Sequence, residues 1–455
     1  MTIFAARARL QTGWATDVRL VVQNGQITDI QTNTTAQPDD TRVDTLLPAQ
    51  SNLHSHSFQR AMAGMTEFRG AGQESFWTWR RLMYQFLDHL TPDHINAIAA
   101  QAFMEMQLAG YAAVGEFHYI HHAQGGQPYD NLAELSTQII NAAVQTGIGL
   151  THLPVLYTYG DVDAQPLAGG QKRFGNNFLT YLKLLDRCDA MVRDLPADTC
   201  VGVAPHSLRA TSPADLQALI TTRPAGPVHI HIAEQMIEVN SVREALGARP
   251  VEWLLDQVDV TDRWCLIHAT HMTATETTRL AATGAVAGLC PVTEANLGDG
   301  IFNGTEYLTA KGRFGIGTDS NMNISVTDEL KQLEYSQRLK HKQRNVMATA
   351  NTSTGETLYA NAAAGGAQAL NRNAGAITIG KLADLVAIDS THPRLCALHT
   401  KHLIDGYLFA ANSAALTDLW SAGRHCVKKR HHIAQDTISA QYRAAMSDLI
   451  ANIDE

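Results

Sequence analysis

Two histidines separated by one residue, His54 and His56, follow an apolar run near the start of the chain. A β-strand sends residues i and i+2 to the same face, so both imidazoles can face one metal ion. Further candidate groups follow other apolar runs: His231, Glu234, His268 and Asp319. Neutral imidazoles with a carboxylate form a nitrogen and oxygen site that suits a borderline divalent metal such as zinc.

Strand-like and helical segments alternate over residues 49–371. Strands are expected near residues 52–56, 113–119, 149–156, 201–207, 228–234, 265–270, 285–291 and 314–320, and helices near 92–109, 131–146, 177–193, 213–222, 250–257 and 274–283. Buried strands joined by crossover helices predict an α/β fold, a (β/α)8 TIM-like barrel whose chemistry gathers at the C-terminal ends of the strands. The candidate groups all fall at such ends, which argues against a chance scatter of polar loop residues.

The two ends of the chain predict a second, smaller unit. Residues 1–48 read as short antiparallel strands with a hairpin at Asn24-Gly25, and residues 372–432 contain a buried-strand run at Leu385–Ile388 after a helix near 354–370. We expect both pieces to form one discontinuous β-sandwich domain. Residues 433–455 are expected to add a C-terminal helix.

Composition restricts the class of protein. The chain has 455 residues, of which 45% are hydrophobic and 17% charged, as in a globular enzyme with a large core. Its net charge of −9 and the absence of a basic stripe argue against nucleic-acid binding. No apolar run reaches the length of a membrane helix, and the first residues lack a signal-peptide pattern, so we expect a cytoplasmic protein without membrane contact. The scattered cysteines indicate reduced thiols.

These motifs together resemble the amidohydrolase superfamily over nearly the whole chain. The metal-site pattern and the stretch Gly375–Asp389, similar to the superfamily's C-terminal sheet domain, carry this likeness. Within the superfamily, the chain is similar to the formimidoylglutamate deiminase family in the segments His54–Gln59, Phe76–Arg80, Glu116–Tyr119, Ala204–Arg209 and His229–Gln235. One departure is Ala49-Gln50, where the superfamily usually has glycine; it precedes the ligands.

The resemblance implies a hydrolase that converts N-formimino-L-glutamate to N-formyl-L-glutamate and ammonia in histidine breakdown, acting as a homodimer. It implies that His54, His56, His231 and Asp319 bind one divalent metal, most readily Zn²⁺. Binuclear members carry a bridging lysine on the fourth strand, whereas the segment 201–207 has none. His54 and His56 could instead be a hydrogen-bonded core pair, and Asp319 could cap a helix. His229 is expected to be a satisfied core histidine.

Proton transfer is assigned to residues near the metal. Glu234 resembles the glutamate of adenosine-deaminase-like members and can move a proton between water and the substrate imine; a structural ion pair is the alternative. His268 can orient the water, and Asp319 can deliver a proton to the leaving amine.

A glutamyl substrate brings two carboxylates, which arginine binds in bidentate fashion. Arg209 follows the fourth expected strand, and Arg80 lies in the expected loop after the first strand. Both match the family's carboxylate-binding positions; spacing alone does not distinguish Arg80 from Arg81. Gln59, Tyr119 and His206 are polar groups expected to bind the substrate, although each could be structural. Trp77 and Trp79 are expected to wall the pocket.

Two other functions compete with this interpretation. A deaminase acting on a purine or pterin-like ring would share the metal site but would need a flatter, less cationic pocket. A catalytically silent scaffold would be expected to have lost metal ligands, and none is missing.

Overall fold

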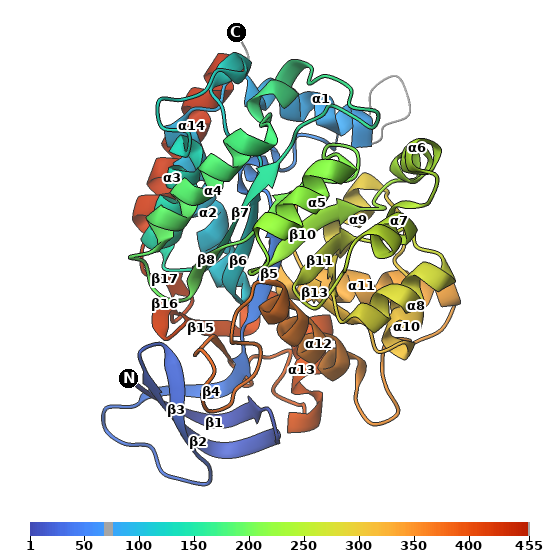
Figure 1. Cartoon of the computed structure of the whole chain (residues 1–455). Coiled ribbons are helices and arrows are strands. Elements are labelled where there is room, and N and C mark those ends of the chain that lie inside the picture. The colour runs from blue at the N-terminus through green and yellow to red at the C-terminus, as the bar shows by residue number, and fades with distance from the viewer. Residues whose placement is uncertain (68–75, 454–455) are drawn as a thin grey trace.

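The computed structural model describes residues 1–67 and 76–453, and of residues 76–81 it describes only the backbone. A ring of parallel strands forms the centre of the molecule (Figure 1). The ring consists of β5 (Gln50–Ser55), β6 (Tyr111–His118), β7 (Gly149–Leu156), β8 (Thr199–Val201) with β9 (Ala204–Pro205), β10 (Val228–Ile232), β11 (Trp264–His268), β12 (Val286–Leu289) and β13 (Arg313–Ile316). The predicted barrel is thereby confirmed.

Two isolated bridges close the ring. Val203 pairs in parallel with Val228, and Ser55 pairs in parallel with Asp319, so the first strand meets the eighth. The fourth strand, expected over 201–207, is split into β8 and β9. The break falls at Gly202 and Val203.

Helices surround the barrel. The helices are α2 (Pro92–Ala109), α3 (Glu134–Thr146), α4 (Phe178–Val192), α5 (Pro213–Thr222), α6 (Met236–Leu246), α7 (Pro250–Gln257), α8 (Ala274–Thr283), α9 (Pro291–Leu297), α10 (Gly304–Thr309), α11 (Val326–His341), α12 (Thr354–Ala369) and α13 (Leu403–Gly406). Four helices, α2, α5, α7 and α8, have the predicted bounds. The side chains of Asn177 and Ser353 cap the N-termini of α4 and α12 and fix where these two helices begin. The segment containing Arg80, expected to be a loop, belongs instead to helix α1 (Phe76–Leu87).

The chain ends form one sheet beside the barrel, coloured blue and red in Figure 1. Its strands run in the order β17 (His431–His432), β16 (Arg424–Lys428), β15 (Leu416–Ser421), β14 (Leu385–Ile388), β4 (Thr41–Pro48), β1 (Thr2–Leu10), β2 (Gly13–Gln23) and β3 (Gln26–Gln31). The pairing of β14 with β4 confirms that the sheet is discontinuous in sequence.

The hairpin between β2 and β3 has the predicted two-residue turn, with Asn24 and Gly25 at φ values of 49° and 79°. One expectation about this region is wrong: β1 and β4 pair in parallel. The reason is that β4 does not pair with β3, which precedes it in the chain. After β3 the chain crosses to the other edge of β1, and β4 pairs there with β1 in the same direction.

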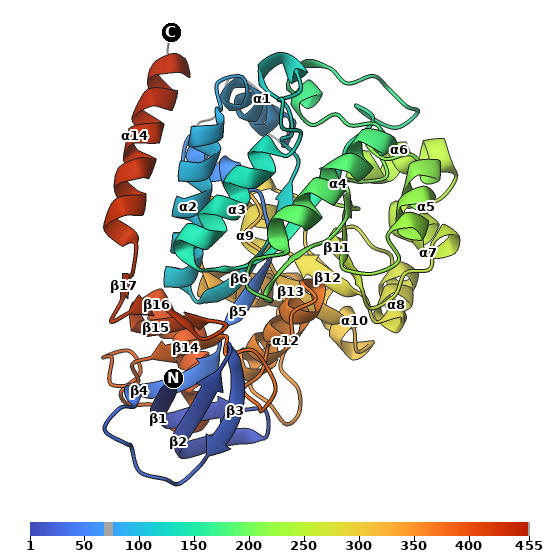
Figure 2. The same cartoon turned by 60° about the vertical axis from the view of Figure 1, so that its left-hand side comes forward.

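The C-terminal helix α14 (Gln435–Ile453) packs along α2 (Figure 2), where His94 Nε2 lies 2.9 Å from Asp448 Oδ2. The division of the chain after residues 48, 371 and 432 stays a prediction. Among the described helices, none combines the length and apolar character needed to cross a membrane.

Candidate metal centre and active site

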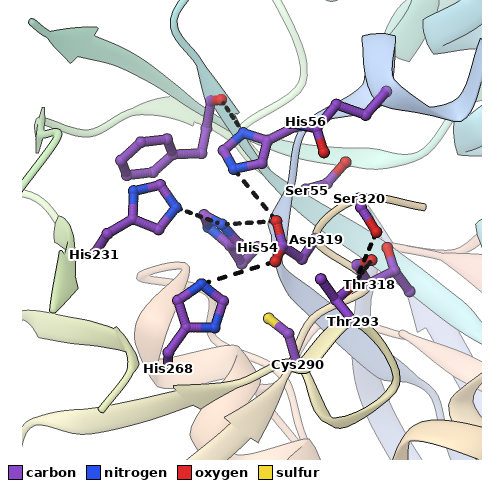
Figure 3. A network of polar contacts seen from close by, with 12 residues as sticks. His54, Ser55, His56, His231, His268, Cys290, Thr293, Thr318, Asp319 and Ser320 are labelled. Atoms are coloured by element: carbon purple, nitrogen blue, oxygen red, sulfur yellow. Dashed lines mark hydrogen bonds and ion pairs between the residues drawn. The ribbon is translucent and has the colours of Figure 1, made fainter. Parts of the chain in front are cut away.

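Three imidazoles and one carboxylate converge at the C-terminal ends of the first, fifth and eighth barrel strands (Figure 3). His54 Nε2 lies 3.1 Å from His231 Nε2 and 3.6 Å from Asp319 Oδ1. His56 Nε2 lies 3.4 Å from the same oxygen of Asp319. All four side chains are buried. The structure thus brings together the four residues that the sequence predicted as metal ligands.

The Nδ1 atoms, which face away from the ligand set, show how the rings of His56 and His231 are oriented. His56 Nδ1 lies 2.9 Å from the carbonyl oxygen of Phe117, and His231 Nδ1 lies 3.2 Å from that of His206. A carbonyl oxygen only accepts, so each Nδ1 carries the hydrogen and each Nε2 turns its lone pair inward. Burial lowers the pKa of His54 to about 3 and that of His231 well below its usual value, which keeps these rings neutral. Inward lone pairs beside a carboxylate fit a divalent cation.

Asp319 is held in place by its backbone. Its N–H donates to the carbonyl of His54 at 3.0 Å, and its own carbonyl accepts from the N–H of His56 at 2.9 Å. Burial would raise the pKa of this carboxyl, but the neighbouring imidazoles hold it below the usual range. The alternative role as a helix cap is wrong, because Ser325 caps the following helix α11.

His268 sits between carboxylates. Its Nε2 lies 3.7 Å from Glu234 Oε1 and 3.7 Å from Asp319 Oδ2. Its Nδ1 lies 3.3 Å from Oε1 of Glu294. Burial opposes protonation, but these carboxylates raise the pKa of His268 well above its usual value. Burial also raises the pKa of Glu234 to about 7. The pair can therefore hold and pass a proton beside the ligand set.

A tight turn aims Glu234 at the site. The preceding residue, Ala233, has a φ of 52°, a left-handed conformation that is uncommon for alanine. The buried carboxylate of Glu238 accepts from the backbone N–H groups of Ala233 at 3.1 Å and Glu234 at 3.0 Å. These two bonds hold a conformation that the backbone alone disfavours.

A cavity adjoins the ligand set and contains four of the predicted substrate-binding residues. Gln59 Nε2 donates to the hydroxyl of Tyr119 at 2.7 Å, and the His206 ring lies 4.5 Å from the ring of Tyr157. The cavity is lined by His56, Gln59, Met83, Tyr119, Tyr157, Phe174, His206, Arg209, His231, Glu234, His268, Thr293, Leu297, Asp319 and Ser320. Its apolar wall is therefore rich in aromatic rings.

Arg209 brings a positive charge into this cavity. Its Nε is buried and has no hydrogen-bond partner, and within the described part of the chain no carboxylate lies within 4 Å of its guanidinium. Burial opposes the charge, while Glu238, Tyr157 and Glu234 raise the pKa of the Arg209 guanidinium. A buried cation without an ion-pair partner is costly, so the cavity favours an anionic ligand.

The structure does not describe the side chains of three residues that the sequence predicted for the pocket: Trp77, Trp79 and Arg80. Arg80 belongs to helix α1. His229 Nε2 donates to the Ala369 carbonyl at 2.8 Å, as expected of a core histidine, while its buried Nδ1 has no hydrogen-bond partner.

Sequence reasoning missed Glu294, Glu238 and the aromatic residues Tyr157 and Phe174. Glu294 shortly follows the seventh strand, so the rule that chemistry gathers at strand ends was a usable signal. Glu238 lies four residues after Glu234, in the first turn of α6, where its carboxylate binds backbone N–H groups that precede the helix. The contacts of both depend on tertiary packing.

Comparison with known proteins places this geometry in a family. A family model described as "Amidohydrolase family" matches residues 45–425, and one described as "Formimidoylglutamate deiminase HutF, N-terminal domain" matches residues 1–44. A formimidoylglutamate deiminase of Pseudomonas aeruginosa is 44% identical over 454 residues, covering 98% of this chain and 99% of the relative. A 5-methylthioadenosine/S-adenosylhomocysteine deaminase of Natronomonas pharaonis is 26% identical, covering 78% of this chain and 75% of the relative.

Solved structures agree on the fold. The crystal structure of an amidohydrolase from Brucella melitensis superimposes with a TM-score of 0.94 at 44% identity, covering 99% of each chain. A zinc-bound adenosine deaminase from Xanthomonas campestris has a TM-score of 0.81 at 21% identity, covering 99% of this chain and 98% of the other, and shares the fold. Matches to a family model over most of its length and to a relative at 44% identity over 98% of its length show that the chain belongs to the amidohydrolase family, within its formimidoylglutamate deiminase branch.

Proposed function

We propose that the chain hydrolyses N-formimino-L-glutamate to N-formyl-L-glutamate and ammonia, a step of histidine breakdown. The observation that carries this proposal is Arg209, a buried guanidinium without a carboxylate partner among the described residues, facing the cavity that holds the candidate ligand set. The full-length similarity to a formimidoylglutamate deiminase supports the same substrate.

One divalent metal, Zn²⁺, is proposed to be held by His54, His56, His231 and Asp319. Their nitrogen and oxygen donors suit zinc, and the segment 199–205 that forms the fourth strand contains no lysine to bridge a second ion. When bound, such an ion lowers the pKa of a water ligand and supplies hydroxide at neutral pH.

The chain's own acids and bases would move the protons. Glu234 is proposed to take a proton from the water that adds to the formimino carbon and to pass it to the terminal nitrogen. His268, 3.7 Å from both Glu234 and Asp319, would orient the water. Asp319 is the second candidate for delivering a proton to the departing amine.

The substrate's glutamyl part would be bound on the other side of the cavity. We assign its carboxylates to Arg209 and Arg80, and hydrogen bonds to the formimino group or a carboxylate to Gln59, Tyr119 and His206. Gln59 Oε1 is buried without a partner, so it can accept a substrate N–H.

Ammonia release tests the proposal directly. Purified protein would be assayed with N-formimino-L-glutamate, adenosine and guanine at equal concentrations. We expect release from N-formimino-L-glutamate alone. Faster release from either purine would contradict the proposal and favour the ring deaminase, for which the aromatic lining from Tyr157 and Phe174 is the supporting feature.

Assembly and location remain proposals of the same kind. The family resemblance supports a homodimer, and the scattered free cysteines agree with a cytoplasmic protein. Sedimentation of the purified protein tests the homodimer: a particle of two chains is expected, and a particle of one chain would contradict it.

A further inference from the structure

We infer that Asn321 is a positioning residue that fixes the two chain segments carrying His54, His56 and Asp319. The inference rests on the metal site proposed above. Asn321 lies two residues after Asp319, is fully buried and has a φ of 56°, a left-handed conformation that asparagine adopts more readily than most residues.

The Asn321 amide joins the first and eighth strands. Its Nδ2 lies 3.1 Å from Ser55 Oγ, 3.1 Å from the carbonyl of His56 and 3.1 Å from the carbonyl of Asp319. Two N–H groups thus serve three acceptors, two of which are the backbone carbonyls of candidate ligands. Within the described part of the chain, Asn321 makes no such contact with His231, which comes from the fifth strand.

The other end of the amide is also fixed. Thr318 Oγ donates to Asn321 Oδ1 at 2.6 Å and accepts from Asn52 Nδ2 at 2.7 Å, while Asn52 Oδ1 accepts from the Thr318 N–H at 3.0 Å. Every polar atom of the Asn321 side chain is therefore used, and its orientation is unambiguous, since a flipped amide would set an oxygen against two carbonyls.

The strained backbone explains why such a group is needed. Asp319 itself has a φ of 46°, and two backbone hydrogen bonds tie it to the strand of His54 and His56. Without the amide, only these two bonds and the two bonds between Asn52 and Thr318 would join the segments that place the carboxylate oxygen 3.4 Å from His56 Nε2 and 3.6 Å from His54 Nε2. Loosening either segment would move ligands apart from one another, which would show as faster metal loss.

Metal release tests this role without relying on catalysis. Zinc-loaded wild type and Asn321→Asp would be mixed with excess chromogenic chelator, and Co²⁺-substituted protein would report ligand geometry by its visible absorption. Asn321→Asp keeps the shape but replaces the donor by an acceptor. Outer-sphere partners of metal ligands typically contribute 10–100-fold to metal affinity, so we expect release about 10–100-fold faster and altered cobalt bands.

Two further variants make the result decisive. Thr318→Val removes the bond to Asn321 Oδ1 and also the acceptor of Asn52 Nδ2, and it should speed zinc release in the same direction; it decides the question if Asn321→Asp does not fold. Asn303→Ala is the matched control, because the Asn303 amide also donates to a carbonyl, that of Met272, at 2.8 Å, but contacts no ligand. It should release zinc at the wild-type rate.

Wild-type release rates and cobalt spectra in Thr318→Val and in folded Asn321→Asp would overturn the positioning role and leave the proposed function intact. Wild-type protein that binds neither zinc nor cobalt would overturn both.

Discussion

The Nε2 atoms of His54 and His231 lie 3.1 Å apart, although 177 residues separate them in the chain. Burial keeps both rings neutral by lowering their pKa values. The outer nitrogen of His231 is occupied by a backbone carbonyl, so its inner nitrogen presents a lone pair. This lone pair and the second imidazole nitrogen, beside the carboxylate of Asp319, fit a site for a cation.

The first prediction concerns metal content. Purified wild-type protein should contain about one divalent metal per chain, and His56→Ala should lose metal and activity together, because it removes one of four donors. Elemental analysis alongside the ammonia assay measures both. Two metals per chain at full activity would contradict the single site.

Glu234→Gln should keep the metal and lose proton transfer. The two side chains have the same shape, but the amide cannot ionise, and general acid–base help is typically worth roughly 10²–10⁴-fold. We therefore expect kcat to fall by at least about 10²-fold with unchanged metal content. A variant within tenfold of wild type would remove Glu234 from this role.

Much of the barrel was predictable because its signals are local. The spacing of His54 and His56, the apolar runs that form the strands, and the Pro and Ser or Thr residues at helix starts each act within a few residues. The parallel pairing of β1 with β4 was missed because it depends on where the chain returns. Phe76–Leu87 was missed as a helix because its aromatic residues favour helices weakly.

The candidate site divides in the same way. Strand-end position predicted the four candidate metal ligands and also Glu234 and His268, and the structure brings these side chains close together. The contacts of Glu294 with His268, and of Asn321 with the first strand, join residues far apart in sequence and could not be inferred from spacing. The lack of a carboxylate within 4 Å of Arg209 among the described residues is likewise a property of packing.

Replacing Arg209 by Met should reduce kcat/KM for the anionic substrate. Loss of one charge-assisted bidentate contact costs roughly 2–5 kcal/mol, which is about 30-fold to several thousand-fold. Arg80→Met should behave similarly. Arg263→Met is the matched control, since Arg263 Nε donates to the Gly226 carbonyl at 2.8 Å and Arg263 does not line the substrate cavity. Unchanged kinetics in either test variant would exclude that arginine from substrate binding.

A buried ion network between the barrel and the sheet should set acid stability. Asp198 Oδ2 lies 3.0 Å from Arg372 and 2.6 Å from Arg424. Burial would raise the pKa of Asp198, but the two guanidinium groups hold it below its usual range. Its contribution is therefore present above the unfolded pKa of about 3.9 and is lost as the pH falls through the lower folded value.

Asp198→Asn should lower the free energy of unfolding by roughly 1.5–3 kcal/mol at pH 7, because it removes the carboxylate that Arg372 and Arg424 share, while Arg372 keeps its second partner, Asp384. The difference from wild type should shrink in strong acid. Urea denaturation at pH 7, 5 and 3 measures it. Asp186→Asn, which removes an exposed partner of Arg223, is the control and should change stability little. Equal effects of the two variants would show that the buried network does not stabilise the fold.

The last prediction concerns which nitrogen leaves. N-formimino-L-glutamate can lose ammonia to give N-formylglutamate, or formamide to give glutamate, and both routes begin with addition of water to the same carbon. The amino-acid nitrogen is tethered to the carboxylates that we assign to Arg209 and Arg80. The terminal nitrogen would then lie toward Glu234 and Asp319, the acids beside the ligand set, and should be the one protonated.

Substrate labelled with ¹⁵N at the amino-acid nitrogen distinguishes the routes by proton NMR. We expect a formyl-amide proton coupled to ¹⁵N, with free ammonia unlabelled. Unlabelled formamide with ¹⁵N-glutamate would mean that the substrate binds in the opposite orientation.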